Sequence, residues 1–90
     1  MEYEYDQDKS EATLRERGID FDFAARLFDG DFIEYEDIRQ DYRERRYVAI
    51  GSIEGVVLTV VYTWREGRRR IISARRASRR ARDAYGRTIA

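Results

Sequence analysis

The chain has 90 residues, with 18 basic and 18 acidic side chains, so its formal net charge is zero. It has no cysteine and no histidine, which excludes disulfides, thiolate nucleophiles, zinc sites built on Cys or His, and imidazole acid-base pairs. This length predicts a single domain over residues 1–90. The longest apolar-rich run, "VVLTVVYTW", is far shorter than the roughly 20 residues of a membrane span. The start of the chain is acidic, unlike a signal peptide, so we expect a soluble cytoplasmic protein.

The zero net charge conceals an asymmetry between the two halves of the chain. Residues 1–44 hold 15 acidic and 6 basic side chains, a balance of −9, whereas residues 45–90 hold 3 acidic and 12 basic ones, a balance of +9. This asymmetry predicts that the halves lie against each other or that each faces an oppositely charged partner. Every cation except Lys9 is an arginine, and eight arginines fall within residues 68–82. The planar guanidinium suits bidentate contacts, which favours a phosphate ligand.

The first thirty residues predict a short strand and two helices. Charged and aromatic residues alternate over "EYEYD" (2–6), which is typical of a strand with one buried face. Asp6 is the expected N-cap of the next helix, and Gly18 suits the left-handed position that ends it. Asp20 is expected to cap a second, short helix. The apolar stripe of that helix is Phe23, Ala24, Leu27 and Phe28.

The remainder of the chain predicts an antiparallel sheet followed by a helix. Strands are expected at 32–36, 46–53, 56–64 and 69–75, with an exposed loop at 37–45 and tight turns at Glu54-Gly55 and Glu66-Gly67. Ser78 is expected to start the last helix, whose inward stripe is Ala81, Tyr85 and Ile89. The predicted fold class is therefore α+β, with an N-terminal short strand and two helices, a three- to four-stranded antiparallel sheet, and a C-terminal helix.

Most enzyme classes lack support in this sequence. It contains no glycine-rich phosphate loop, no metal-ligand spacing, and no nucleophile with a histidine partner. We therefore expect neither a cofactor nor a metal ion. Arginine, tyrosine, one lysine and carboxylates remain as the groups that could carry chemistry.

The order of several short motifs resembles the BrnT family of toxins from bacterial type II toxin-antitoxin pairs. The motifs are "YDQDK", "GIDF", "AARLF", "RYVAIG", "VVYT" and "ISARRA", and they span nearly the whole chain. The resemblance implies a fold similar to the RelE-type ribonucleases and an endoribonuclease activity on RNA. It also implies a cognate antitoxin, a BrnA-like ribbon-helix-helix protein, which covers the toxin and carries the pair to operator DNA.

Three positions depart from the family pattern, since Thr13, Arg17 and Ala81 stand where the family commonly has Asn, His and Glu. Lys9, Thr13 and Arg17 are four residues apart and share one face of the first helix. Transesterification of RNA requires deprotonation of the 2′-hydroxyl, stabilisation of the phosphorane charge, and protonation of the leaving 5′-oxygen. Fixed guanidinium groups can meet the second need, and Lys9 is the candidate base. The predicted catalytic residues are Lys9, Arg17, Arg75 and Arg79, and the predicted RNA-binding residues are Arg76, Arg80, Tyr62 and Tyr47.

Two functions remain open from the sequence. The first is an endoribonuclease toxin neutralised by its antitoxin. The second is a catalytically weakened interaction module that binds its antitoxin and assists promoter repression, which the missing His and Glu favour. Other charged and aromatic residues have simpler interpretations: surface charge for Arg68, Arg69 and Arg70, and packing for Tyr3, Tyr5 and Trp64. The acidic residues of "FIEYEDIRQD" have three possible roles, which we rank in this order: a solvated edge, a lid over the basic surface, and contacts with the antitoxin.

Overall fold

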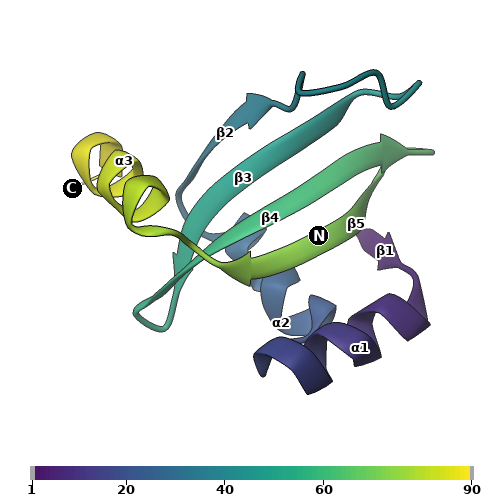
Figure 1. Cartoon of the computed structure of the whole chain (residues 1–90), viewed down its shortest axis with the longest axis horizontal. Coiled ribbons are helices and arrows are strands. Elements are labelled where there is room, and N and C mark those ends of the chain that lie inside the picture. Colours follow the sequence, from purple (N-terminus) through teal and green to yellow (C-terminus); the bar gives the residue numbers. More distant parts are fainter. Residues whose placement is uncertain (1, 90) are drawn as a thin grey trace.

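The computed structural model describes residues 2–89, and the fold is a sheet with helices on both faces (Figure 1). In chain order the elements are β1 (Tyr3–Tyr5), α1 (Gln7–Arg17), α2 (Phe21–Ala25), the 3-10 helix η1 (Arg26–Asp29), β2 (Phe32–Glu36), β3 (Arg46–Ile53), β4 (Val56–Arg65), β5 (Arg68–Arg76) and α3 (Arg79–Ile89). The α+β class is confirmed. Strands β2 and β3 have the expected bounds, and β4 and β5 are slightly longer than expected.

The five strands form one mixed sheet in the order β1-β5-β4-β3-β2. The prediction of three to four antiparallel strands was wrong in this respect, because β1 joins the sheet and pairs in parallel with β5. Strand β1 is also tied to α2, since the hydroxyls of Tyr3 and Tyr5 both donate to the Asp22 carboxylate, at 2.7 and 3.0 Å. The parallel partner of β1 comes from the opposite end of the sequence, so no local pattern could reveal it.

The helix ends form where the sequence predicts them. The Asp6 carboxylate accepts from the backbone N–H groups of Asp8 and Lys9, and Gly18 takes a left-handed φ of 76°. The Asp20 carboxylate accepts from the N–H of Phe23 at 2.8 Å. These caps are local interactions, which explains why the sequence alone is enough to predict them.

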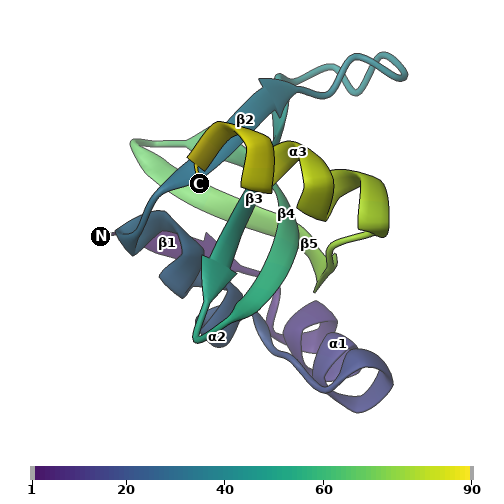
Figure 2. The same cartoon turned by 90° about the vertical axis from the view of Figure 1, so that its left-hand side faces the viewer.

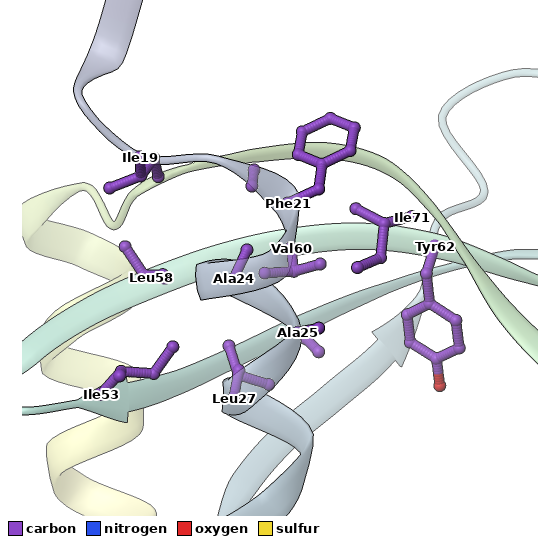
Figure 3. Close-up of a cluster of buried hydrophobic side chains, with 12 residues drawn as sticks. Ile19, Phe21, Ala24, Ala25, Leu27, Ile53, Leu58, Val60, Tyr62 and Ile71 are labelled. Atoms are coloured by element: carbon purple, nitrogen blue, oxygen red, sulfur yellow. The ribbon is translucent and has the colours of Figure 1, made fainter. Parts of the chain in front are cut away.

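The hydrophobic core lies between the sheet and the segment from Ile19 to Leu27 (Figure 3). The sheet contributes Ala49, Ile53, Leu58, Val60, Tyr62, Ile71 and Ala74, and the facing segment contributes Ile19, Phe21, Ala24, Ala25 and Leu27. The expected stripe of the second helix is confirmed for Ala24 and Leu27, which are buried, whereas Phe23 and Phe28 are half-buried against the core. The face of the sheet that carries this core is called the helix face below.

The opposite face of the sheet is only partly covered. Helix α3 contacts β2 and β3, and Figures 1 and 2 show it crossing this face at one end. Its expected inward stripe is shallow, because Ala81 and Tyr85 are half-buried and Ile89 is 37% exposed. This side of the sheet, including the part beneath α3, is called the open face below. No helix within residues 2–89 has the length and apolar character needed to cross a membrane.

Candidate nucleic-acid interface

The open face carries a pocket of about 480 Å³. Val48 and Val61 lie on the open-face sides of β3 and β4, and Arg75 reaches the pocket from β5. Arg17 enters from the end of α1, and Arg39 enters from the loop that follows β2. The fold therefore brings cations from three distant parts of the sequence to one hollow.

A second pocket of about 240 Å³ lies under α3 and shares Tyr35, Thr59 and Arg75 with the first. Arg80 and Ala81 of α3 line it. Because the two pockets share these residues, they form one continuous depression across the open face. The residues lining the two pockets are called the arginine groove below.

A shift of register places Arg75 in this groove. Val61 pairs with Ser73, but the next residue, Tyr62, pairs with Ile71, so Ile72 is an extra residue in β5. In an unbroken strand, residues 71 and 75 would share a face. The extra residue reverses the alternation, as a β-bulge does, so that Ile71 faces the core and Arg75 faces the groove.

The end of α1 and the end of β5 are joined by a reciprocal pair of hydrogen bonds. Arg17 donates from Nη1 to the carbonyl oxygen of Ala74 at 2.8 Å, and Arg76 donates from Nη1 to the carbonyl oxygen of Arg17 at 2.6 Å. The charge of Arg76 also lies at a helix C-terminus, where a cation is favourable. Arg76 therefore holds the backbone of Arg17 in place. The Arg17 side chain is in turn fixed next to Arg75 by its bond to the carbonyl of Ala74.

The acidic half of the chain neutralises the groove only in part, because Glu36 and Asp37 line it and Asp37 is paired with Arg39. Glu2 and Glu4 of the acidic half lie 3.8 and 3.6 Å from Arg68 and Arg70, along the β1-β5 edge. Within residues 2–89, ion pairs to Arg17 and Arg75 are absent, and the same holds for Arg79 and Arg80. The lining of the groove holds four arginines and two carboxylates, so it keeps a net positive charge.

The wall of the groove nearest β2 is built around one buried carboxylate. Asp37 is 5% exposed and accepts from Arg39 through the backbone N–H at 3.2 Å, Nε at 2.8 Å and Nη2 at 2.7 Å, and from the Tyr42 hydroxyl at 3.1 Å. The bond from Arg39 lowers the pKa of Asp37 to about 2, against the opposing effect of burial. The expectation of a solvated edge was wrong for this residue, because the loop folds back over it.

One family of known proteins matches the chain, over residues 5–81, and it is described as the ribonuclease toxin BrnT of type II toxin-antitoxin systems. The chain belongs to this BrnT family. The resemblance inferred from the short motifs is thereby confirmed, and with it the assignment as a toxin of a type II system with ribonuclease activity and an antitoxin partner. A search of curated proteins finds no match to the chain.

Two of the four predicted catalytic residues meet in the groove of this BrnT family member. Arg17 and Arg75 line the larger pocket, whereas Lys9 and Arg79 line neither pocket and are exposed. Lys9 precedes Arg17 by eight residues of α1, which is roughly 12 Å along a helix axis. The shared helix face of Lys9 and Arg17 therefore does not bring the amine to the same hollow as the guanidinium.

The predicted RNA-binding residues divide in the same way. Arg80 lines the groove, while Arg76 binds the end of α1. Tyr62 is fully buried on the helix face and donates its hydroxyl to Glu34 Oε1 at 2.6 Å; burial and this bond raise its pKa to about 12. Tyr47 is half-buried beside it, with ring centroids 5.5 Å apart. Because the Tyr62 ring has no exposed surface, its burial does not support the predicted contact with RNA.

Arg69 differs from the surface charge that we expected at residues 68–70. Its guanidinium lies over the rings of Phe28 and Trp64, at 4.3 and 4.6 Å from their centroids. Cation-π contacts of this kind make the arginine part of the packing on the helix face. The packing role expected of Trp64 is confirmed by this contact, although the side chain is 48% exposed.

Two groove residues were missed by sequence reasoning, namely Tyr35 and Arg39. Tyr35 is 57% exposed and lines both pockets. A signal for it exists, because it is an aromatic residue between two glutamates in a strand whose side chains alternate between faces. Arg39 has no such signal, since its place depends on how the loop closes around Asp37.

The bond network of Asp37 predicts an acid-sensitive loop. Because the folded pKa lies below the ordinary value, the carboxylate stabilises the fold fully above about pH 4, and this contribution is lost as the pH falls toward 2. We expect the free energy of unfolding to decrease over this range in the wild type and to depend less on pH in Asp37→Asn. Urea unfolding between about pH 2 and pH 5 measures this. Asp29→Asn, at an exposed aspartate of η1, is the control and should keep the wild-type pH dependence.

Proposed function

We propose that this BrnT family member is an endoribonuclease that binds the scissile phosphate of RNA between Arg17 and Arg75, and that a cognate antitoxin neutralises it. The observation that carries the proposal is the convergence of these two guanidinium groups on one pocket without an ion pair to any carboxylate of residues 2–89. Guanidinium groups bind phosphate through paired N–H donors. Unpaired arginines in a hollow of this size therefore favour a phosphodiester ligand.

The proposed reaction is transesterification within the RNA strand. The 2′-oxygen loses its proton and attacks phosphorus, the bond from phosphorus to the 5′-oxygen breaks, and that oxygen takes up a proton. The products are a 2′,3′-cyclic phosphate and a 5′-hydroxyl. Arg17 and Arg75 would stabilise the extra negative charge of the phosphorane, and fixed donors of this kind reduce a barrier most when they need no reorganisation.

The proton transfers are the weaker part of the site. Of the two carboxylates that line the larger pocket, Asp37 is held by Arg39 and Tyr42, and Glu36 lies at the exposed end of β2. Water would then accept and supply protons, without the gain that a matched acid-base pair provides. We therefore expect slow turnover, driven mainly by electrostatic stabilisation.

A cleavage assay on the purified protein tests the proposal. End-labelled RNA should be cut to fragments that carry a 5′-hydroxyl. Because the proposed charge stabilisation comes from Arg17 and Arg75, we expect cleavage to continue at the same rate in EDTA. Absence of cleavage, together with normal growth of cells that express the chain without its antitoxin, would contradict the proposal.

The second candidate function is an interaction module that binds its antitoxin, proposed to be a ribbon-helix-helix protein, and assists repression at operator DNA. Two observations favour this module: Asp37 is bound by Arg39, and Lys9 lies outside the groove. Both leave the site without a general base of matched pKa. Operator binding by the purified toxin-antitoxin pair, combined with no growth arrest and no RNA cleavage by the toxin alone, would leave only the module.

A further inference from the structure

The loop between β2 and β3 supplies a third arginine to the groove. Arg39 lines the larger pocket opposite Arg75, and its side chain is 73% exposed although the side chain of its partner Asp37 is only 2% exposed. We propose that Arg39 binds a second phosphate of the RNA strand, next to the one held by Arg17 and Arg75, and that Asp37 is the residue that positions it. This inference rests on the proposed function and specifies its substrate as single-stranded RNA.

The hydrogen bonds of Arg39 fix its direction. Nε and Nη2 donate to the two carboxylate oxygens of Asp37, at 2.8 and 2.7 Å, in a bidentate pair. Nη1 makes no such bond to Asp37 and remains on the outer side of the guanidinium. An arginine held in one orientation loses less conformational entropy when a ligand binds than a freely rotating one does. The buried carboxylate therefore prepares an exposed cation for binding.

The width of the sheet separates this cation from the others. Strands β4 and β3 lie between β5 and β2, so Arg75 is three strand spacings, roughly 14 Å, from the strand that leads to Arg39. Long side chains could span part of this width, but the bidentate bonds to Asp37 hold the Arg39 guanidinium on the β2 side of the groove. Two phosphates of one strand therefore suit the groove better than one.

The floor between the two cationic walls suits an unpaired base. It is formed in part by Val48 and Val61, and the exposed ring of Tyr35 stands at its side. Single-stranded nucleic acids bind to surfaces that combine basic side chains for phosphates with aromatic rings on which bases stack. Bases paired within a duplex are not free to stack in this way. The groove therefore fits a single strand, with Tyr35 as the stacking residue.

Binding of a fluorescent single-stranded RNA with 2′-O-methyl groups, which prevent cleavage, tests the role of Arg39 at a series of salt concentrations. Arg39→Ala should weaken affinity about tenfold and reduce the slope of log affinity against log salt by about 0.7, the value for one lost phosphate contact on a single strand. Arg45→Ala removes the same charge from an exposed position of the same loop that does not line the groove. This control should keep both the affinity and the slope of the wild type.

Two further variants separate binding from folding. Arg39→Gln keeps a donor for Asp37 without the charge and should show the same reduction in slope, so it serves if Arg39→Ala unfolds. Asp37→Asn keeps the charge of Arg39 and removes a carboxylate beside the groove, which by charge alone would strengthen RNA binding. We expect weaker binding instead, because the orientation of Arg39 is lost.

Several outcomes would overturn the inference. If both Arg39 variants bind as Arg45→Ala does while Arg75→Ala binds poorly, Arg39 is not an RNA contact and the proposed function stands. If the Arg39 variants lose only binding to the antitoxin, the wall serves the protein partner instead. If the wild type does not bind RNA, both proposals fail.

Discussion

Arg75→Ala is expected to lower the RNA cleavage rate at least about a hundredfold, the cost typical of removing one donor that stabilises transition-state charge. Arg75 lines both pockets of the groove and has no carboxylate partner within residues 2–89. Its place is fixed by the shifted register of β5 and by the bond from Arg17 to the neighbouring carbonyl of Ala74. Arg17 cannot take over the position of the Arg75 guanidinium, because its own guanidinium is held by the hydrogen bond to Ala74.

Arg65→Ala is the matched control for this measurement. Arg65 is an exposed arginine at the far end of β4, outside the groove, and its removal changes the net charge equally. Single-turnover cleavage of labelled RNA should separate the two variants, with Arg65→Ala close to the wild type. Arg75→Lys should fall between them, since an amine keeps the charge but not the bidentate fork. Equal rates for Arg75→Ala and Arg65→Ala would show that net charge alone matters, and would contradict the assigned site.

Leu27→Ala is expected to lower the free energy of unfolding by about 2–5 kcal/mol, as deletions of fully buried leucines do. Leu27 is 1% exposed in η1 and packs against β3, where a Cβ on Gly51 would stand only 2.9 Å from its Cγ. The sheet carries the arginine groove on its other face, so loss of this packing threatens the site indirectly. A loss of this size is a large part of the total stability of a small domain.

Urea unfolding followed by circular dichroism measures this effect against Leu14→Ala, because Leu14 is a leucine of α1 that is 49% exposed. The control should change stability by no more than about 0.5 kcal/mol, as surface substitutions usually do. Gly51→Ala alone should cost about 1–3 kcal/mol from overpacking. The double variant Leu27→Ala/Gly51→Ala should lose less free energy of unfolding than the two single variants lose together, because the Cγ atom that crowds residue 51 is gone. Equal costs for Leu27→Ala and Leu14→Ala would contradict the packing argument.

Features that depend on near neighbours along the chain could be predicted without coordinates. The caps at Asp6 and Asp20 and the hairpin turns follow from residues a few positions apart, and the structure confirms them. In the two turns, Gly55 and Gly67 take a positive φ, which glycine adopts readily, but so do Glu54 and Glu66, at 50° and 52°. The family, too, could be inferred from short motifs, because their order along the chain needs no coordinates.

Which side chains form the site could not be predicted in this way, because it depends on contacts between distant parts of the chain. Alternation places Tyr62 on the same side of β4 as Leu58 and Val60, but it does not say that helices cover that side. One extra residue in β5 moves Arg75 from the helix face to the groove. The convergence of Arg17, Arg39 and Arg75 likewise depends on strand order, register and loop closure. These are contacts between residues far apart in the chain, and their free energy comes from burial and hydrogen bonding that no short stretch of sequence contains.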